Sequence, residues 1–527
     1  MSVMTGKQLI GFGESGEGEE SIRAVNPATG EVLEPGFCEA VEGEIDRAMG
    51  LAAEAAVEMR RFSGEKLAGL CEAIAEELEA AKGQLLERCG VETGYPEARL
   101  NGEFGRTVGQ MRQFAAVARE GRWLHAVIDH GDPSRQPLPK PDVRRMMVAL
   151  GPVVVFGASN FPLALSAAGG DTASALAAGC PVVVKGHPSH PGTCEIAARA
   201  IVAAVKRCGF PEGTFSMVQG ASNRVGGLLV KHEETAAVGF TGSLKGGRAL
   251  FDLAADRPVP IPVYAEMGSI NPQFVMPGVL DSDPEGFAEA LFGSVTLGNG
   301  QFCTNPGIVF VVKGAEGTDT FLRKYKELVA ESEAAAVLNQ GIADGYENGV
   351  VALESIEGIE VSRGRGGDRG IRVGAVVAVS DLSVFVENRD RLEEEVFGPS
   401  TVIVQCRGLS DFGSVAESFP GQLASSVHGT ESDLSGCGVL IEDLSRSAGR
   451  IIVNGFPTGI EICEGMHHGG RYPAATDSHF TSIGFGAIAR WGRPVAFQGM
   501  PQSLLPPALR DDNPLRISRV VDGSPQG

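Results

Sequence analysis

Residues 298–307 read Gly298-Asn299-Gly300-Gln301-Phe302-Cys303-Thr304-Asn305-Pro306-Gly307. An apolar, helix-like run, Gly286 to Leu297, stops at this segment, and a strand-like run, Ile308 to Val312, starts directly after it. A cysteine in such a glycine-flanked turn can be presented to a cleft with its backbone N–H beside it, which suits a thiolate that attacks a carbonyl group. The alternative is a packed structural cysteine, which is the usual state of a free cysteine.

The composition limits the class of protein. The chain has 527 residues, enough for two or more domains, and a net charge of −21 that argues against nucleic-acid or anionic-membrane partners. Its ten cysteines include no Cys-x-x-Cys pair, which fits free thiols in a reducing compartment. Its nine histidines form no cluster with ligand spacing, and the adjacent pair His467-His468 cannot point both rings at one ion, so we expect no metal site. No apolar stretch reaches about 18 residues, so we expect no transmembrane helix and a cytoplasmic location.

A repeated strand–turn–helix pattern occupies residues 151–265. Five apolar runs alternate there with alanine-rich helical stretches, and they are Val153–Phe156, Val182–Val184, Thr214–Val218, Ala236–Phe240 and Ile261–Ala265. This alternation predicts a parallel sheet with helices on both faces, the dinucleotide-binding kind of architecture, although the Gly-x-Gly-x-x-Gly fingerprint is absent. A second α/β run follows from Asn271 to about Val453.

The regions outside these runs are less regular. Residues 1–20 are expected to be a loose leader, and residues 26–32 a turn between two short strands. Helical spacing predicts helices within 45–56, 63–89 and 100–117. Residues 143–150 read as an exposed strand that can pair with another subunit. A second strand is expected at 489–497, with the last fifteen residues along the surface.

Polar residues follow several of the predicted strands, at the edge where α/β sheets bind ligands. Asn160, after the strand 153–156, can donate to an oxyanion beside the Cys303 N–H, or can serve as a helix N-cap. Glu266, after the strand 261–265, can act as a general base, or can be a solvated loop residue.

Other strand ends suggest contacts to a phosphate or a sugar. Gly242 and Ser243 precede a predicted helix whose free N–H groups can bind a pyrophosphate, and the alternative is a plain Ser N-cap. Lys185 closes a strand, in a position suited to a ribose or phosphate contact. Glu395 and Phe397 lie in an acidic loop that says little when taken alone.

Taken together, these motifs resemble the signatures of the aldehyde dehydrogenase superfamily, in the same order, over about residues 20–500. The resemblance implies an α/β chain with two Rossmann-like parallel-sheet domains and a small β-strand oligomerisation flap, forming a homodimer or homotetramer. The expected boundaries are 1–136 with 151–265 for the cofactor-binding domain, 266–465 for the catalytic domain, 137–150 with 480–500 for the flap, and 501–527 for a C-terminal tail.

The resemblance also implies residue roles. Cys303 is expected to be the nucleophile, Glu266 the base and Asn160 part of the oxyanion hole. The cofactor-binding residues it implies are Lys185, Gly242, Ser243, Glu395 and Phe397. Ser159 stands where many relatives have tryptophan, beside the cofactor.

The sequence departs from the family where the adenosine ribose is expected. Many NAD-dependent relatives have a glutamate three residues after the strand-end lysine, and here Pro188 follows Lys185 at that distance. No carboxylate then repels a 2′-phosphate, and Ser189, His187 and Arg224 are possible phosphate partners. NADP is therefore the expected cofactor, with NAD not excluded.

The segment 465–484 resembles the branch of the family that oxidises 2,5-dioxovalerate (α-ketoglutarate semialdehyde) to 2-oxoglutarate. That substrate carries a distal carboxylate, which Arg106, Arg112 or Arg471 could meet. Two alternatives stay open: an NADP-dependent fatty or other medium-chain aldehyde dehydrogenase, and a catalytically idle relative that acts as a binding or structural protein. The presence of Cys303, Glu266 and Asn160 together argues against an idle relative.

Overall fold

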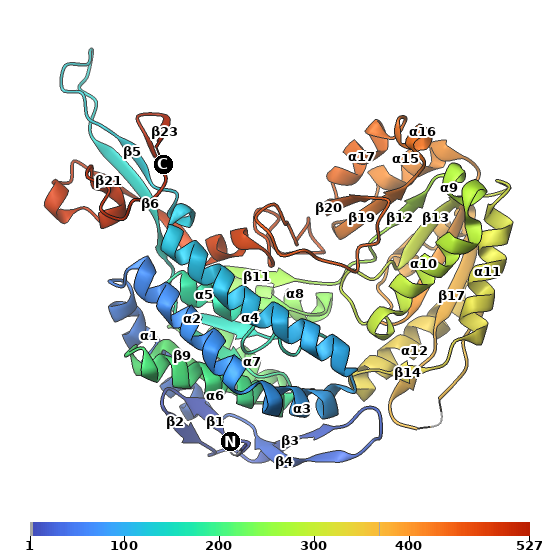
Figure 1. Cartoon of the computed structure of the whole chain (residues 1–527), viewed down its shortest axis with the longest axis horizontal. Helices are drawn as coiled ribbons and strands as arrows, with labels where there is room; N and C mark the ends of the chain where they lie inside the picture. Colours follow the sequence, from blue (N-terminus) through green and yellow to red (C-terminus); the bar gives the residue numbers. More distant parts are fainter. Residues whose placement is uncertain (1–3, 368, 527) are drawn as a thin grey trace.

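Two large sheets and a projecting arm organise the chain in the computed structural model, which describes residues 4–367 and 369–526 (Figure 1). Within this part the architecture is α/β with parallel-sheet domains, as the sequence predicts. The first sheet has the strand order β11 (Val263–Glu266), β10 (Ala237–Thr241), β7 (Val153–Phe156), β8 (Val182–Lys185), β9 (Phe215–Val218), β1 (Gln8–Ile10) and β2 (Gly13–Ser15). The strands from β11 to β9 are parallel, and β1 and β2 join antiparallel.

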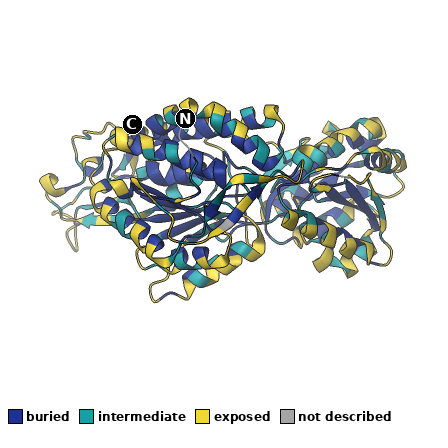
Figure 2. Ribbon diagram, turned by 90° about the horizontal axis from the view of Figure 1, so that it is seen from below, coloured by how far each residue is buried: buried dark blue, intermediate teal, exposed yellow. Residues whose placement is uncertain are grey.

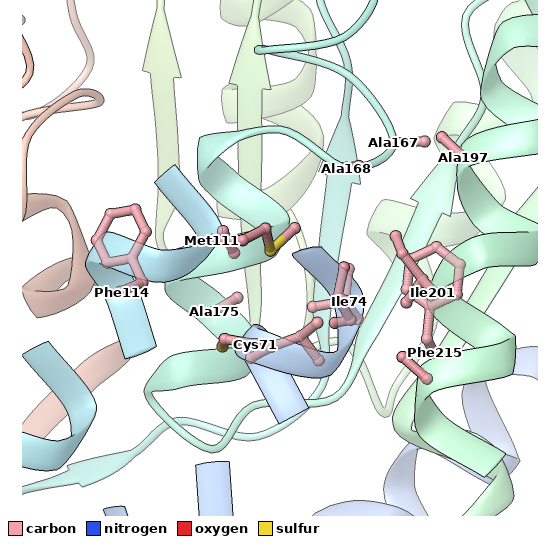
Figure 3. Packing of buried hydrophobic residues seen from close by; sticks show 14 of the residues in the cluster. Cys71, Ile74, Met111, Phe114, Ala167, Ala168, Ala175, Ala197, Ile201 and Phe215 are labelled. Carbon is pink, nitrogen blue, oxygen red and sulfur yellow. The ribbon is translucent and has the colours of Figure 1, made fainter. Parts of the chain in front are cut away.

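Helices cover both faces of the first sheet, because its parallel strands are apolar on both sides. Val182 and Val184 of β8 pack in one hydrophobic cluster, and Val183 between them packs in another. Figure 3 shows part of the first cluster, where Met111 lies near Ala175 of the alanine-rich α5 (Gly170–Ala177) and Phe215 lies beside Ile201. The helices of this part are α1 (Glu42–Met59), α2 (Gly64–Ala80), α3 (Lys82–Thr93), α4 (Glu97–Glu120), α5 (Gly170–Ala177), α6 (Pro191–Arg207), α7 (Asn223–Lys231) and α8 (Leu244–Ala255).

The second sheet has the strand order β15 (Glu360–Arg363), β17 (Val376–Asp381), β18 (Ser400–Cys406), β13 (Ile308–Val312), β12 (Gln273–Val275), β19 (Gln422–His428) and β20 (Ala448–Val453). Its strands are parallel except β15. Its helices are α9 (Pro277–Ser282), α10 (Pro284–Thr296), α11 (Thr318–Glu331), α12 (Gln340–Glu354), α13 (Leu382–Glu387), α14 (Arg389–Leu392), α15 (Leu409–Glu417), α16 (Glu431–Leu434) and α17 (Gly438–Ser445). Figure 2 shows that both large sheets are buried and that exposed residues lie on the outer helices.

The arm contains a five-stranded sheet that extends from the first domain (Figure 1). Its strands are β21 (Gly492–Gln498), β6 (Val143–Ala149), β5 (Val127–Asp129), β22 (Arg519–Val521) and β23 (Ser524–Gln526). Two small pairs complete the strands: β3 (Glu20–Val25) with β4 (Val32–Cys38), and β14 (Ala335–Ala336) with β16 (Arg372–Val373). Among the described residues, no helix combines the length and apolarity that crossing a membrane requires.

Both chain ends differ from the sequence-based expectation. The expected leader, of which residues 1–3 lie outside the described residues, forms β1 and β2 at the edge of the first sheet. Leu9 is buried there, and Gln8 accepts a hydrogen bond from the Gln219 N–H at 2.6 Å. The expected surface tail forms β22 and β23, since Ile517 and Val521 are buried in the small core of the arm. Strands of three residues are too short for hydrophobic alternation to reveal them.

Two further boundaries differ. The helix expected over 63–89 is two helices, α2 and α3, which meet at Ala81. The strand expected at 489–497 begins at Gly492, because Trp491 ends a short 3-10 helix and is fully buried, with its indole N–H donating to Ser174 at 2.8 Å.

Candidate active site

The turn that carries Cys303 lies between α10 and β13, as predicted. Gly298, Asn299 and Gly300 have positive φ angles of 57°, 53° and 69°. A Cβ atom on Gly300 would come within 2.1 Å of the Gly398 carbonyl carbon, so glycine is required there. The turn therefore brings the Cys303 backbone against the loop that follows α14.

Asn271 fixes the backbone of the nucleophile. Its side-chain amide is buried and donates to the carbonyl oxygens of Cys303 at 3.0 Å and Asn305 at 2.9 Å. Sequence reasoning missed this residue. Its position directly after the Glu266-Met267-Gly268 motif was the available signal.

Asn160 lies at the end of β7 and faces the Cys303 segment. Its Nδ2 donates to the carbonyl oxygen of Gln301 at 2.9 Å, and its own carbonyl accepts from Arg99 at 2.8 Å and Tyr95 at 3.2 Å. An amide has a second N–H, which leaves Asn160 a donor for a developing oxyanion. The two loops are thereby held together across the two domains.

A histidine links the thiol to the carboxylate. His468 Nε2 lies 3.6 Å from Cys303 Sγ and 2.9 Å from Glu266 Oε1. His468 is fully buried, and Glu266, the last residue of β11, is 3% exposed. Ser482 donates its hydroxyl proton to the other oxygen of Glu266. Cys303 is half-buried as a whole residue.

The charges in this cluster oppose each other. Burial, together with the negative charge and hydrogen bond of Glu266, raises the pKa of the Cys303 thiol well above its ordinary value. Burial also raises the pKa of Glu266, but the charge and hydrogen bond of His468 outweigh it, so this pKa is lowered overall. The resting pair is therefore a thiol beside a carboxylate, and the carboxylate can take the thiol proton.

His468 was not among the predicted site residues. The sequence presented it only as half of an adjacent pair unsuited to a metal. The chain returns after β20 to the first sheet, where Ala475 forms a bridge with Glu266, and this crossing brings His468 to the thiol. No local pattern signals a contact that depends on such a return.

Several residues implied by the resemblance to bind a cofactor lie near the domain boundary. Ser243 is the N-cap of α8 and accepts from the Gly246 N–H at 3.2 Å, and the start of that helix is exposed. Gly242 leaves no room for a Cβ, which would meet the Phe240 ring at 2.7 Å. Burial lowers the pKa of Lys185 to about 8.

Glu395 and Phe397 line a cavity of about 20 Å³ with Gly300 and Phe302, next to the nucleophile turn. Burial, opposed by a backbone hydrogen bond from Ser269, raises the pKa of Glu395 to about 8. An exposed helix start, a strand-end lysine and a buried acid are groups of the kind that bind the phosphates and sugars of a dinucleotide.

The other four predicted cofactor contacts differ in their burial and in their partners. Ser159 is half-buried beside Asn160. The Ser189 hydroxyl accepts from Asn339 Nδ2 at 2.7 Å. Arg224, in the first turn of α7, is 59% exposed and lies 3.6 Å from Glu42. Burial, with the charges of His190 and Lys185, lowers the pKa of His187 well below its ordinary value, so a neutral His187 adds no cation for a phosphate.

Glu39 introduces a carboxylate that the sequence did not suggest. It accepts hydrogen bonds from the Ala221 and Ser222 N–H groups at 3.3 Å each, at the start of α7. The negative charge of Glu39 partly opposes the lowering of the Lys185 pKa by burial, so the two side chains lie near each other.

The three candidate arginines lie in different places. Arg106 of α4 is half-buried, and its positive charge opposes the rise in the pKa of the Cys303 thiol. Arg112 lies six residues further along the helix, about 120° around its axis. It is exposed and pairs with Glu79 at 2.7 Å. Arg471 is exposed and donates to the Arg446 carbonyl at 3.2 Å. Arg112 and Arg471 are therefore not brought to the thiol.

A reactive thiol held where two parallel-sheet domains meet, with an amide and a carboxylate beside it, defines an enzyme that works through a cysteine nucleophile. The model of the Aldehyde dehydrogenase family matches residues 14–478, and the chain belongs to that family. It is thus an aldehyde dehydrogenase, an NAD(P)-dependent oxidoreductase that converts an aldehyde to a carboxylic acid.

Two proteins are similar over nearly their full length. The "Alpha-ketoglutaric semialdehyde dehydrogenase 2" of Azospirillum brasilense is 46% identical over 522 residues, covering 99% of both chains. The "Alpha-ketoglutaric semialdehyde dehydrogenase" of Acinetobacter baylyi is 40% identical over 524 residues, again covering 99% of both.

Solved structures share the fold at low identity. The NAD⁺ complex of an aldehyde dehydrogenase from Bacillus cereus superposes with a TM-score of 0.79 at 22% identity, covering 93% of this chain and 96% of that one. A 1-pyrroline-5-carboxylate dehydrogenase superposes with a TM-score of 0.78 at 19% identity, covering 93% and 92%. These likenesses confirm the predicted fold.

Proposed function

We propose that this enzyme oxidises 2,5-dioxovalerate, which is α-ketoglutaric semialdehyde, to 2-oxoglutarate. The names of the two full-length relatives support this substrate. The single observation that carries the proposal is Arg106, whose Nε and Nη2 are buried and have no hydrogen-bond partner among the described residues. A buried guanidinium with unused donors beside the nucleophile suits a carboxylate at the far end of the substrate.

Arg106 is held so that it can serve this purpose. Its guanidinium carbon lies 5.4 Å from the centre of the Phe161 ring, and Glu103 on the same helix balances part of its charge. Glu103 itself accepts from the Leu163 N–H at 2.8 Å and the Ala164 N–H at 3.1 Å, so it does not close off the arginine. A purely apolar aldehyde would leave these buried donors unpaired, which disfavours a fatty aldehyde.

In this proposal the protein groups act in sequence. Glu266 accepts the Cys303 proton, and the thiolate attacks the aldehyde carbon. Asn160 Nδ2 and the Cys303 N–H stabilise the oxyanion of the tetrahedral adduct. Lys185, Ser243 and Glu395 would hold a nicotinamide cofactor, which would supply the hydride acceptor. Loss of hydride from the adduct would leave a thioester on Cys303.

Glu266 releases the Cys303 proton to solvent and, as a carboxylate again, serves as the base for hydrolysis. With His468 and Ser482 it lines a cavity of about 20 Å³, which is large enough to admit one water molecule. Removal of a water proton by Glu266 directs hydroxide at the thioester and releases the acid. His468 holds the carboxylate toward the sulfur through both steps.

We further propose NADP as the preferred cofactor. Pro188 stands three residues after Lys185, so no carboxylate at that position opposes a 2′-phosphate. The exposed Arg224 supplies a cation for the phosphate. Glu39 is the observation that favours NAD, since its carboxylate already lies at the start of α7 beside Lys185.

The decisive experiment is a panel of aldehydes with and without a distal carboxylate, assayed with both cofactors. We expect the highest catalytic efficiency with 2,5-dioxovalerate and NADP. A preference for long apolar aldehydes would refute the substrate, and a strong NAD preference would refute the cofactor choice. No turnover with any aldehyde would favour an idle relative.

We also propose that the arm pairs with a second copy in a homodimer or homotetramer. Its edge strand β21 alternates between exposed and half-buried residues and has backbone groups free on one side. Light scattering after chromatography tests this proposal, and a monomer would refute it. The need for a free Cys303 thiol supports a reducing compartment such as the cytoplasm.

A further inference from the structure

We propose that the resting active site is also a Zn²⁺ site, formed by Cys303, His468 and Glu266, and that zinc bound there reversibly blocks the enzyme. One donor atom from each residue lies within 4.8 Å of the other two. A thiolate, an imidazole and a carboxylate are donor types that zinc uses in sites with an open fourth position. This inference concerns the unliganded enzyme and does not depend on which aldehyde it oxidises.

The spacing of the donors is close to what zinc requires. Zn–S bonds of about 2.3 Å and Zn–N bonds of about 2.0–2.1 Å at a tetrahedral angle separate sulfur and nitrogen by roughly 3.6 Å. Cys303 Sγ and His468 Nε2 are 3.6 Å apart. Nitrogen and oxygen donors require about 3.4 Å, against 2.9 Å between His468 Nε2 and Glu266 Oε1. Cys303 Sγ and the Glu266 oxygen lie within 4.8 Å of each other. The ion therefore needs a side-chain shift that brings the three donors around one point.

The protons balance on binding. Cys303 loses its thiol proton to solvent, and His468 binds the ion through the Nε2 lone pair, so any proton on Nε2 is released as well. Glu266 is already ionised. The two negative charges then neutralise Zn²⁺, while the positive charge of Arg106, which acts on Cys303, opposes the ion.

Neighbouring groups orient two of the three donors. Ser482 donates to the second oxygen of Glu266, and Thr481 Oγ1 accepts from the His468 backbone N–H at 2.7 Å. His468 Nδ1 has no partner among the described residues, so the usual outer hydrogen bond of a metal-bound histidine is missing. We therefore expect reversible rather than structural zinc binding, with selectivity against the hard ions Mg²⁺ and Ca²⁺.

The consequence is competition with the aldehyde. Cys303 is half-buried, and zinc and the aldehyde must reach the same sulfur atom. A zinc-bound sulfur shares a lone pair with the ion and is a weaker nucleophile than the free thiolate, and the ion occupies the space in front of it. Zinc should therefore protect the thiol as well as inhibit turnover.

The test uses ZnCl₂ and the full-length enzyme without cofactor, in competition with a chromogenic zinc indicator. We expect one tight equivalent in the wild type and in the controls H467N, which alters the adjacent histidine, and C208S, which removes a half-buried cysteine of the first domain. H468N and C303S should bind more than about 100-fold more weakly, since loss of even an outer-shell partner can cost 10–100-fold. Equal affinity in H468N and H467N would overturn the proposal.

A spectroscopic measurement keeps the test independent of folding defects. Co²⁺ added to the wild type should give a thiolate charge-transfer band that C303A lacks and that excess Zn²⁺ removes. Zn²⁺, but not Mg²⁺, should slow the alkylation of Cys303 by iodoacetamide. Absence of the band in the wild type, or alkylation that zinc does not slow, would overturn the site.

Discussion

His468 Nε2 lies 2.9 Å from Glu266 Oε1, although the two residues are 202 positions apart in the chain. The contact holds the carboxylate toward Cys303, whose sulfur is 3.6 Å from the same nitrogen. Because both residues are buried, their interaction is little screened by solvent. The general base and the nucleophile are therefore positioned by one imidazole.

Replacing the nucleophile and the base should separate the two chemical steps. C303A should lose aldehyde oxidation, because no other group can form the thioester, and should still bind cofactor. E266Q should still give a burst of reduced cofactor, because loss of the Glu266 charge lowers the pKa of the Cys303 thiol and solvent can take its proton. Turnover after the burst should be slower by about 10²–10⁴-fold, since general base catalysis of hydrolysis is lost. Stopped-flow absorbance checks both variants. Unchanged turnover in C303A would refute the assignment.

The reactivity of the thiol should depend on pH in a defined direction. A raised pKa keeps Cys303 protonated at neutral pH, so its alkylation rate should increase as the pH rises through a midpoint above the ordinary cysteine value. E266Q removes the nearby negative charge and should move this midpoint to lower pH. The exposed Glu394 provides the control E394Q, which should leave it unchanged. Iodoacetamide kinetics from pH 6 to 10 measure the shift, and a midpoint that rises in E266Q contradicts it.

Arg106 should affect anionic aldehydes selectively. Loss of a buried charged partner costs about 2–4 kcal/mol, so R106M should lower kcat/KM for 2,5-dioxovalerate by roughly 30–1000-fold. The efficiency with pentanal should change little, because that substrate has no distal carboxylate. R112M, at the salt bridge with Glu79, is the matched control. Equal losses with both aldehydes would mean that Arg106 has only a structural role.

Glu39 should restrict the cofactor. E39Q removes a charge near Lys185, which should strengthen NADP binding by about 1 kcal/mol, or roughly fivefold, and leave NAD binding almost unchanged. Fluorescence titration of both cofactors measures this without turnover. E54Q, at an exposed position of α1, should have no effect. An equal change in affinity for NADP and NAD would mean that Glu39 does not lie near the 2′-phosphate of NADP.

Glu395 should make the stability of the unliganded enzyme pH-dependent. Its pKa is raised from 4.5 to about 8 in the folded chain, so the folded state keeps a proton that the unfolded state releases. The stabilisation that the protonated Glu395 gives to the folded state is complete below about pH 4.5 and is lost as the pH rises toward about 8. E395Q should flatten this decline. The Tm of E395Q minus that of the wild type should therefore be greater at pH 8.5 than at pH 5.5. Parallel Tm curves for both proteins would contradict it.

The local sequence was sufficient for most of the framework. The strand runs before Ser159 and after Gly307 appear as β7 and β13 with the predicted boundaries, because valine-rich runs buried on both faces are unambiguous. Short edge strands such as β1 and β22 were not predictable, since three residues carry no period and their pairing depends on distant partners.

The chain by itself determined the fold, the nucleophile turn and the candidates for base and oxyanion donor, because these depend on local spacing and on motif order. Only the tertiary structure decided which arginine faces the thiol and that His468 joins Cys303 and Glu266. Those contacts arise where α4 and the segment after β20 pack against the ends of two sheets. Side chains far apart in sequence meet there through packing, which no local pattern encodes.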